Sequence, residues 1–268
     1  IKNIIDRTIM DDCFMYAFKN CWGLKDAPCK EGIVQDINRI SYLGFISHLR
    51  RINTPLSSSA KVRAPHSLHG SSWGIMCPSE TPDGANIGVR KNLSTISSIS
   101  FGTNSRALEQ LLFTSKVMDI KQIDPNKNKG TKVFLNERLI GYTYEPNYLF
   151  NKLKIHKRNA LINIYTSIAW YKSENIIKLS TDSGRGIRPV FIVKDNKINL
   201  TKEILSRLGS EEDNLNWNHL IGGFKRQDNK TPYDDTDSQY YSINDSELED
   251  YEATEGIIEY IDSEESNT

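Results

Sequence analysis

The chain has 268 residues, of which 34 are basic and 34 acidic, so its formal net charge is zero. This length allows a substantial buried core and more than one domain. The zero net charge excludes a uniformly basic surface for nucleic acid, but it does not exclude a local basic patch.

Charge is unevenly distributed along the sequence. Between positions 39 and 91 only two acidic residues, Glu80 and Asp83, accompany seven basic ones, which are Arg39, Arg50, Arg51, Lys61, Arg63, Arg90 and Lys91. Residues 231–268 contain thirteen acidic residues and no basic one. We therefore expect these two regions to face partners of different chemistry.

The cysteines and the apolar runs indicate the cellular compartment. No two of the four cysteines, Cys13, Cys21, Cys29 and Cys77, have the short spacing that is typical of a zinc site. So few cysteines predict free thiols in a reducing compartment. No apolar run approaches the roughly 18 residues of a membrane span. We therefore expect a soluble intracellular protein with no membrane partner.

The first quarter of the chain is predicted to be helical. Residues 1–29 contain apolar side chains at helical spacing, namely Phe14, Ala17 and Phe18. Ile33, Ile37 and Ile40 predict a second helix that continues to about Arg51. Pro55 is expected to end it, because a proline disfavours the α region in the residue before it. Residues 56–64 are then predicted to form a short polar loop, followed by an irregular loop rich in proline and glycine.

From about residue 98 the pattern predicts mixed α and β structure. Residues 133–142 are expected to form two strands around an Asn136-Glu137 turn, followed by a helix over 147–162. Residues 176–193 are typical of a strand, a glycine-rich turn and a second strand, and 204–239 of loops. An acidic helix with a Ser or Asp cap and a closing strand are expected over 242–262.

These patterns predict an α+β chain with several domains. The expected domains are a helical lead-in, a helical region with the irregular loop, a mixed α/β domain, and a domain with an acidic end. Their predicted bounds are 1–29, 30–97, 98–200 and 201–268.

The basic side chains at the end of the second predicted helix have two interpretations. His48, Arg50 and Arg51 place positive charge at a helix C-terminus, which is favourable by itself. Guanidinium groups also match the geometry of phosphate oxygens. Lys61 and Arg63 in the next loop favour a phosphate-binding surface for nucleic acid.

The irregular loop, residues 69–88, has three interpretations. Cys77 and His69 resemble a nucleophile and its base, but Pro78 removes an amide that often serves an oxyanion hole. The amides near Gly84 and Gly88 resemble a phosphate cradle, although no known glycine-rich phosphate motif is present. The third interpretation is a rigid scaffold, fixed by prolines, whose polar side chains are Glu80, Asp83 and Asn86.

Residues 47–94 resemble the fork region of the second-largest, beta-type subunit of multisubunit DNA-directed RNA polymerases. The similar motifs are His48-Leu49-Arg50-Arg51, Leu68-His69, Trp73-Gly74, Cys77-Pro78, Glu80-Thr81-Pro82-Asp83-Gly84 and Gly88. Further landmarks follow in the family's order, among them STDSGRGIRPVFIVKD and EGIIEYIDSEE. The resemblance implies a fragment of a longer subunit, with the fork domain followed by the two external domains.

The resemblance also implies a role for each candidate residue. It assigns contacts with template DNA, the RNA–DNA hybrid or downstream DNA to His48, Arg50, Arg51, Asn53, Lys61, Arg63 and His66. It makes Glu80, Asp83 and Asn86 a scaffold near the active centre. It implies that the largest subunit holds the catalytic Mg²⁺ ions, that this chain binds no cofactor or metal and has no catalytic residue, and that it meets nucleoside triphosphates only indirectly. The largest subunit and other polymerase subunits are the expected protein partners.

Several residues indicate the branch of the family and the departures from it. Trp73 and Lys91-Asn92-Leu93 favour the eukaryotic, archaeal or large-DNA-virus branch, and hence a location in the nucleus or cytoplasm, or in a viral factory or virion. Asp83 replaces a family glutamate and His66 an arginine. Arg188 is interpreted as structural or solvated, and the acidic end as a solvated face or a protein-contact surface. The alternative is a free-standing, non-catalytic module that binds nucleic acid or protein.

Overall fold

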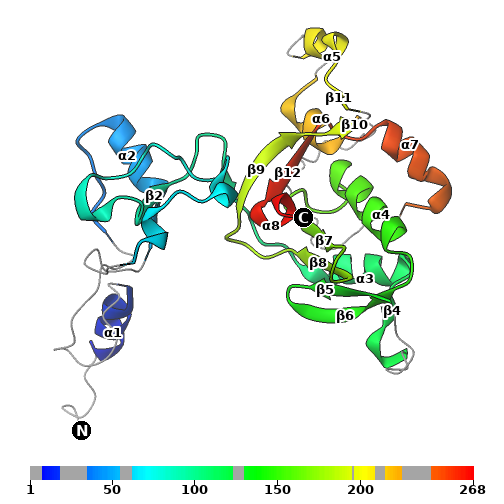
Figure 1. The fold of residues 1–268 in the computed structure, drawn as a ribbon, viewed down its shortest axis with the longest axis horizontal. Coiled ribbons are helices and arrows are strands. Elements are labelled where there is room, and N and C mark those ends of the chain that lie inside the picture. Colours follow the sequence, from blue (N-terminus) through cyan, green and yellow to red (C-terminus); the bar gives the residue numbers. More distant parts are fainter. Residues whose placement is uncertain are drawn as a thin grey trace. The chain divides into compact units, whose positions relative to one another are not determined.

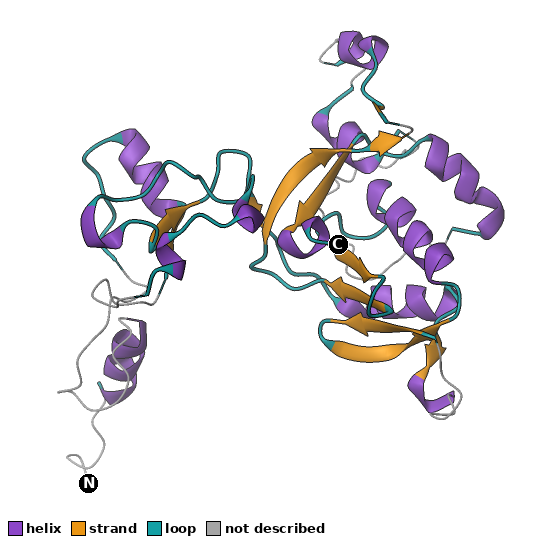
Figure 2. Cartoon of the chain, in the orientation of Figure 1, coloured by secondary structure: helices purple, strands orange, loops and turns teal. Residues whose placement is uncertain are grey.

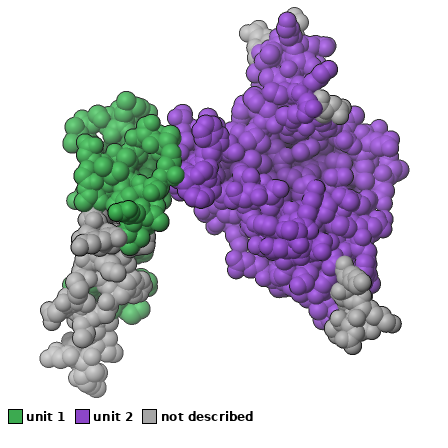
Figure 3. Space-filling model, in the orientation of Figure 1, with its two compact units in different colours: residues 1–68, 77–93 green, residues 69–76, 94–268 purple. Residues whose placement is uncertain are grey.

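The computed structural model describes residues 8–18, 35–54, 62–122, 130–194, 196–208, 215–224 and 243–268. The chain divides into two compact units, shown in Figure 3. Unit 1 comprises residues 1–68 and 77–93, and unit 2 comprises residues 69–76 and 94–268. The irregular loop of residues 69–88 is therefore shared by both units. The predicted four-domain division remains a prediction.

Unit 1 consists mostly of loops between short elements (Figure 2). Its helices are α1 (Ile9–Phe18) and α2 (Tyr42–Leu49), and its strands are β1 (Arg51–Asn53) and β2 (Arg90–Asn92). The irregular loop and the segment before it contain three short 3₁₀ turns, η1 (Ala64–His66) and η3 (Gly84–Asn86) in unit 1 and η2 (Gly70–Ser72) in unit 2. The helix predicted within residues 1–29 is confirmed over α1.

The prediction of a helix from Ile33 to Arg51 is wrong over residues 35–41. This segment has no regular structure, and α2 begins only at Tyr42. The Asn38 side chain accepts the Ile40 N–H at 3.0 Å, and the Ser41 hydroxyl accepts the Gly44 N–H at 3.0 Å. Such side-chain bonds to the backbone compete with a helix and mark its start. Ile33 lies outside the described residues.

Unit 2 is built on a five-stranded sheet in the order β4-β6-β5-β8-β7 (Figure 1). Its strands are β4 (Met118–Asp119), β5 (Thr131–Leu135), β6 (Arg138–Thr143), β7 (Ser167–Tyr171) and β8 (Ile176–Ser180). Only β5 and β8 pair in parallel. The predicted turn between β5 and β6 is confirmed, because Asn136 and Glu137 have φ values of 48° and 64°, as a two-residue hairpin requires.

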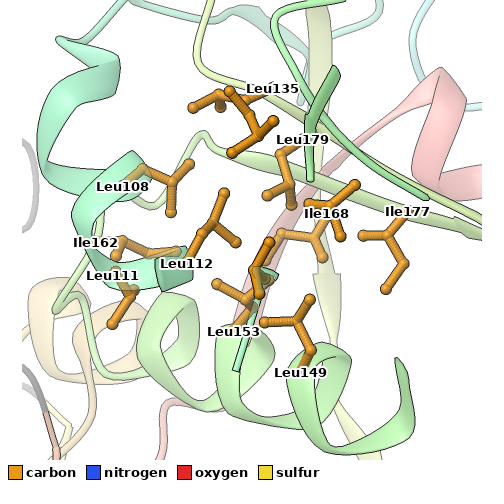
Figure 4. Packing of buried hydrophobic residues seen from close by; sticks show 13 residues of the cluster. Leu108, Leu111, Leu112, Leu135, Leu149, Leu153, Ile162, Ile168, Ile177 and Leu179 are labelled. Carbon is orange, nitrogen blue, oxygen red and sulfur yellow. The ribbon is translucent and has the colours of Figure 1, made fainter. Parts of the chain in front are cut away.

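Two helices cover this sheet, α3 (Ser105–Thr114) and α4 (Pro146–Arg158). Leucines from both helices meet the inward side chains of the strands in one apolar cluster (Figure 4). Leu111, Leu149 and Ile177 are completely buried in it. The helix predicted over 147–162 ends earlier, at Arg158, because Ala160 takes a left-handed conformation with φ 50°.

A second sheet contains three antiparallel strands in the order β12-β9-β3. These are β3 (Ser98–Ile99), β9 (Gly186–Phe191) and β12 (Ile258–Asp262). The strands predicted around the glycine-rich turn, β8 and β9, are present, but they belong to different sheets. The remaining elements are η4 (Ile120–Gln122), β10 (Val193–Lys194), β11 (Lys197–Ile198), α5 (Lys202–Arg207), α6 (Trp217–Gly222), η5 (Asp245–Glu247), α7 (Leu248–Ala253) and α8 (Ser263–Ser266).

The acidic helix and closing strand predicted near the end are confirmed as α7 and β12. The predicted Ser or Asp cap of that helix is wrong, because its N-cap residue is Glu247, whose side chain makes no capping bond. The α+β fold class is confirmed. In the described part of the chain, none of the helices has the length and apolar character that a membrane span requires.

The acidic end of unit 2 is only partly a solvated face: the acidic residues of η5 and α7 are exposed, whereas those of β12 and α8 include buried carboxylates. Glu259 and Glu265 have side chains only 5% and 3% exposed, and they form ion pairs with basic residues of α4. Lys157, itself 2% exposed, lies 2.7 Å from Glu265, and Lys154 lies 2.5 Å from Glu259. Burial raises the pKa of the Glu259 carboxyl, but the charges of Lys157, Lys154 and Arg158 outweigh this and lower it to about 2.

We predict that removing one buried partner of this network destabilises unit 2 strongly. Lys157→Met should lower the free energy of unfolding by about 3 kcal/mol, because Glu265 then keeps only Lys154 as its cation and the buried network loses one positive charge. Lys178→Met is the matched control, since Lys178 pairs with Glu264 at the surface, and it should cost less than about 1 kcal/mol. Urea unfolding at pH 7 measures both, and equal losses would contradict the prediction.

A second prediction concerns acid. The pKa of His156 is lowered from 6.5 to about 4. Burial is the main cause and the Lys152 charge acts in the same direction, while the hydrogen bond to the Lys152 carbonyl opposes them. Unfolding restores a pKa near 6.5, so the unfolded chain binds more protons and stability falls as pH drops from 6.5 to 4. The full effect is about 3 kcal/mol. In His156→Leu the loss of stability between pH 6.5 and pH 4 should be smaller by this amount. Urea unfolding across this pH range measures it, and a pH profile equal to that of the unsubstituted chain would refute the prediction.

Candidate nucleic-acid interface

The pairing of β1 with β2 assembles the candidate site in unit 1. Arg51 lies opposite Asn92, and Asn53 lies opposite Arg90. The Leu93 N–H donates to the Arg50 carbonyl at 3.1 Å, which extends the ladder by one bond. The end of α2 is thereby joined to the chain that leaves the irregular loop. No strand was predicted at Arg51–Asn53, which lies between the predicted helix and the loop predicted over 56–64.

Three of the predicted nucleic-acid residues share one cleft. The cleft has a volume of about 260 Å³ and is lined by Gln35, Ile37, His48, Leu49, Arg51 and Asn53. It offers one permanent cation, two amides and an imidazole beside two aliphatic side chains. A guanidinium with neighbouring amides suits a phosphate or sugar edge, because all three groups donate hydrogen bonds.

His48 supports the cleft from within. Its Nδ1 accepts the Asn38 N–H at 3.1 Å, so Nε2 carries the proton and donates to Gln35 Oε1 at 3.1 Å. Both ring nitrogens are therefore engaged inside unit 1. The geometry makes the imidazole a support for residues 35–38, rather than a donor directed at a ligand.

Glu80 is fixed by two other parts of unit 1. The Ser47 hydroxyl of α2 donates to its carboxylate, and the Asn92 side-chain amide donates to its backbone carbonyl at 3.1 Å. Asn92 is only 4% exposed. Sequence reasoning missed Asn92 as a site residue, and a single asparagine in a short polar strand gives no signal of this role.

The loop that follows, residues 81–88, is closed by Thr81. Its hydroxyl accepts the Gly88 N–H at 2.9 Å and donates to the Arg90 carbonyl at 3.1 Å. Asp83 precedes η3 without capping it and is exposed, whereas Asn86 ends η3 and is half-buried. The two residues therefore stand at opposite ends of one short turn that is closed at its base.

The remaining candidates lie on or near η1 and α2. Arg63 precedes η1 and is exposed, and His66 Nδ1 donates to the Ile87 carbonyl at 2.6 Å. Arg50 is the C-cap residue of α2 and is half-buried. Lys61 lies outside the described residues.

In unit 2, residues 74 and 75 are held tightly. The Ser94 and Ser97 hydroxyls donate to the carbonyls of Gly74 and Ile75, each at 2.8 Å. Arg188 lies against Gly74, where a Cβ atom would come within 2.7 Å of its Cδ. Arg188 is thus packed on the backbone of the irregular loop, in keeping with its structural interpretation.

The alternative chemistry of the loop finds little support. His69 Nδ1 accepts the Ser71 N–H at 3.2 Å and caps η2, so this nitrogen is used locally. Cys77 is a half-buried free thiol. Across the described ranges, no three His, Cys, Asp or Glu side chains are placed to hold a metal ion.

Comparison with known proteins decides the family. Residues 35–99 match the family description "RNA polymerase Rpb2, domain 3", and residues 133–194 match "RNA polymerase Rpb2, domain 4". The chain is 34% identical over 218 residues to the DNA-directed RNA polymerase II subunit RPB2 of Encephalitozoon cuniculi, which covers 80% of this chain and 19% of that protein. The chain belongs to the Rpb2 family of RNA polymerase second-largest subunits.

Two further Rpb2-family relatives define the branch. Subunit 2 of RNA polymerase II from Arabidopsis thaliana is 30% identical over 92% of this chain and 18% of its own length. Subunit Rpo2 from the archaeon Saccharolobus solfataricus is 33% identical over 68% of this chain and 17% of its own length. The resemblance to the eukaryotic and archaeal branch is confirmed. The chain spans about a fifth of the length of these relatives.

The geometry of the loop predicts unequal costs for two glycine substitutions. Gly84 and Gly88 both have left-handed φ values, 78° and 72°, but only Gly88 is crowded, since its Cβ would lie 2.6 Å from the His66 carbonyl oxygen. Gly84→Ala should therefore cost about 1 to 2 kcal/mol for the backbone alone. Gly88→Ala should cost about 2 to 4 kcal/mol, because the clash is with backbone. Amide exchange of residues 89–93 measures both costs, and equal values would contradict the clash.

Proposed function

We propose that this chain is part of a DNA-directed RNA polymerase and that unit 1 contributes a surface that contacts nucleic acid during RNA synthesis. The main observation in support of this proposal is the cleft that His48, Arg51 and Asn53 share. The membership of the Rpb2 family supports the assignment to a polymerase. The relatives' names further suggest a nuclear location if the enzyme is of the RNA polymerase II type.

The proposed contacts follow from the chemistry of each side chain. Arg51 is always charged and presents a planar fork of donors, so it would bind a phosphate of the RNA–DNA hybrid. Asn53 is exposed at the end of β1 and would donate to a neighbouring phosphate or sugar oxygen. Arg50 would contribute charge beside them.

The loops of η1 and η3 would face other parts of the nucleic acid. Lys61 and Arg63 would lie near downstream DNA, with His66 beside them. Asp83 and Asn86 would stand near the RNA end, positioned by Thr81 and Glu80. Phosphoryl transfer itself would use Mg²⁺ held by the largest subunit, the main protein partner, so this chain supplies positioning, not chemistry. Nucleoside triphosphates would meet it only indirectly.

A salt titration tests the contact of Arg51. In a polymerase assembled with this chain, Arg51→Ala should weaken binding of an RNA–DNA hybrid scaffold and reduce the slope of log affinity against log salt by about one. Asn53→Ala should weaken binding and leave the slope unchanged, because no charge is lost. Arg138→Ala is the matched control, since Arg138 is an exposed arginine of unit 2 that pairs with Glu109.

The same titration contains its own refutation. If Arg51→Ala and Arg138→Ala changed affinity and slope equally, the cleft would not be the contact surface. A different result would favour the free-standing module: full affinity of the isolated chain for the scaffold, with no gain on adding the other polymerase subunits.

A further inference from the structure

Two loops of unit 1 that carry candidate residues are joined by direct contacts. We name them the η1 loop, residues 62–68, and the η3 loop, residues 81–88. The first carries Arg63 and His66, and the second carries Asp83 and Asn86. Neither loop contains a strand or a helix of more than three residues. No backbone hydrogen bond joins these two described loops, so side-chain hydrogen bonds contribute to their spacing.

Lys91 makes the contact that reaches both loops at once. It lies on β2, and its ammonium group donates to the Pro65 carbonyl at 3.2 Å and to the Gly88 carbonyl at 2.5 Å. One carbonyl belongs to the η1 loop and the other ends the η3 loop. An ammonium group has three donors, so a single lysine can bind both oxygens together.

The charge of Lys91 is used within the fold. The side chain is half-buried, and it forms no ion pair with a carboxylate among the described residues. Backbone carbonyl dipoles therefore stabilise the cation. Moving Lys91 away from the two loops would cost free energy, because two carbonyls and the ammonium group would lose their hydrogen bonds.

Two further contacts join the same loops. His66 Nδ1 donates to the Ile87 carbonyl at 2.6 Å. The Gly88 backbone lies so close to His66 that a Cβ atom would come within 2.6 Å of the His66 carbonyl oxygen. Both contacts are between the same two loops that Lys91 joins.

We propose that Lys91 is a positioning residue that fixes the η1 loop against the η3 loop, and so sets the spacing between Arg63 and the Asp83–Asn86 turn. Its importance for RNA synthesis rests on the proposed function. Its action on the loops does not, because that action follows from contacts within unit 1 alone.

Hydrogen exchange of the complete 268-residue chain tests the junction without nucleic acid. In Lys91→Met, which keeps the length of the side chain but has no donor, the Gly88 and Val89 amides should exchange about tenfold faster. The Leu93 amide, which is bound to the Arg50 carbonyl, should be unaffected. Lys91→Arg should restore slow exchange, since a guanidinium can also donate to two carbonyls. Unchanged exchange at Gly88 and Val89 in Lys91→Met would overturn the proposal.

A second variant covers the case in which Lys91→Met unfolds unit 1 and accelerates every amide there. His66→Phe removes only the histidine bond, and with Lys91 intact it should accelerate the Gly88 and Val89 amides less than about threefold. An acceleration of about tenfold or more in His66→Phe would assign the junction to His66 and overturn the proposal.

The functional consequence is measured in the assembled polymerase. Lys91→Met should lower kcat for nucleotide addition by about tenfold with little change in KM, and Lys91→Arg should restore it. If exchange responds and kcat does not, the positioning role is overturned, while the proposed function still stands or falls on the Arg51 salt titration. If that titration fails and the exchange result holds, only the proposed function is lost.

Discussion

The three-residue pairing of β1 with β2 is the constraint on which the candidate interface depends. It joins Arg51 to Asn92 across forty positions of sequence, and it brings the end of α2 beside the end of the irregular loop. Closing a loop of this length costs conformational entropy, and three residue pairs offset only part of that cost. Asn92 adds to the ladder, because its buried amide also holds the Glu80 carbonyl. The same strand pair therefore supports several residues of the candidate interface. The ladder orients Arg51 and Asn53 of β1, and Asn92 of β2 holds Glu80.

Unit 2 contains a network of buried ion pairs. The net charge of zero conceals a basic helix, α4, packed against an acidic end formed by β12 and α8. Buried charges are costly unless each is paired, and here Lys157 and Glu265 form such a pair within a larger network. Glu259 and Glu265 therefore hold this end against α4, whereas the acidic residues of η5 and α7 remain exposed.

Local chemistry made part of this structure predictable. The Asn136-Glu137 hairpin and α4 follow from turn residues and helical spacing that need no distant partner. The helix expected over 35–41 failed, because isoleucine spacing was read without the competing bonds of Asn38 and Ser41. Resemblance to a family pointed to Arg51 and Asn53 as site residues, but it marked Lys91 and Asn92 only as indicators of the branch. The contacts of Lys91 and Asn92 are with carbonyls that only the fold brings near, so the sequence pattern did not reveal these roles.

The irregular loop has restraints in addition to its prolines. A proline fixes one φ angle of its own residue, and both Pro78 and the loop around it remain solvent-accessible. Glycines add a restraint of another kind, because they allow backbone or side chains to approach closely, as Gly88 does with His66 and Gly74 with Arg188. Any side chain at these two glycines would force the contacts apart. Asp83 lies in a loop whose two ends, Thr81 and Gly88, are joined by a hydrogen bond. The restraint acts on the backbone, so the Asp83 side chain remains exposed.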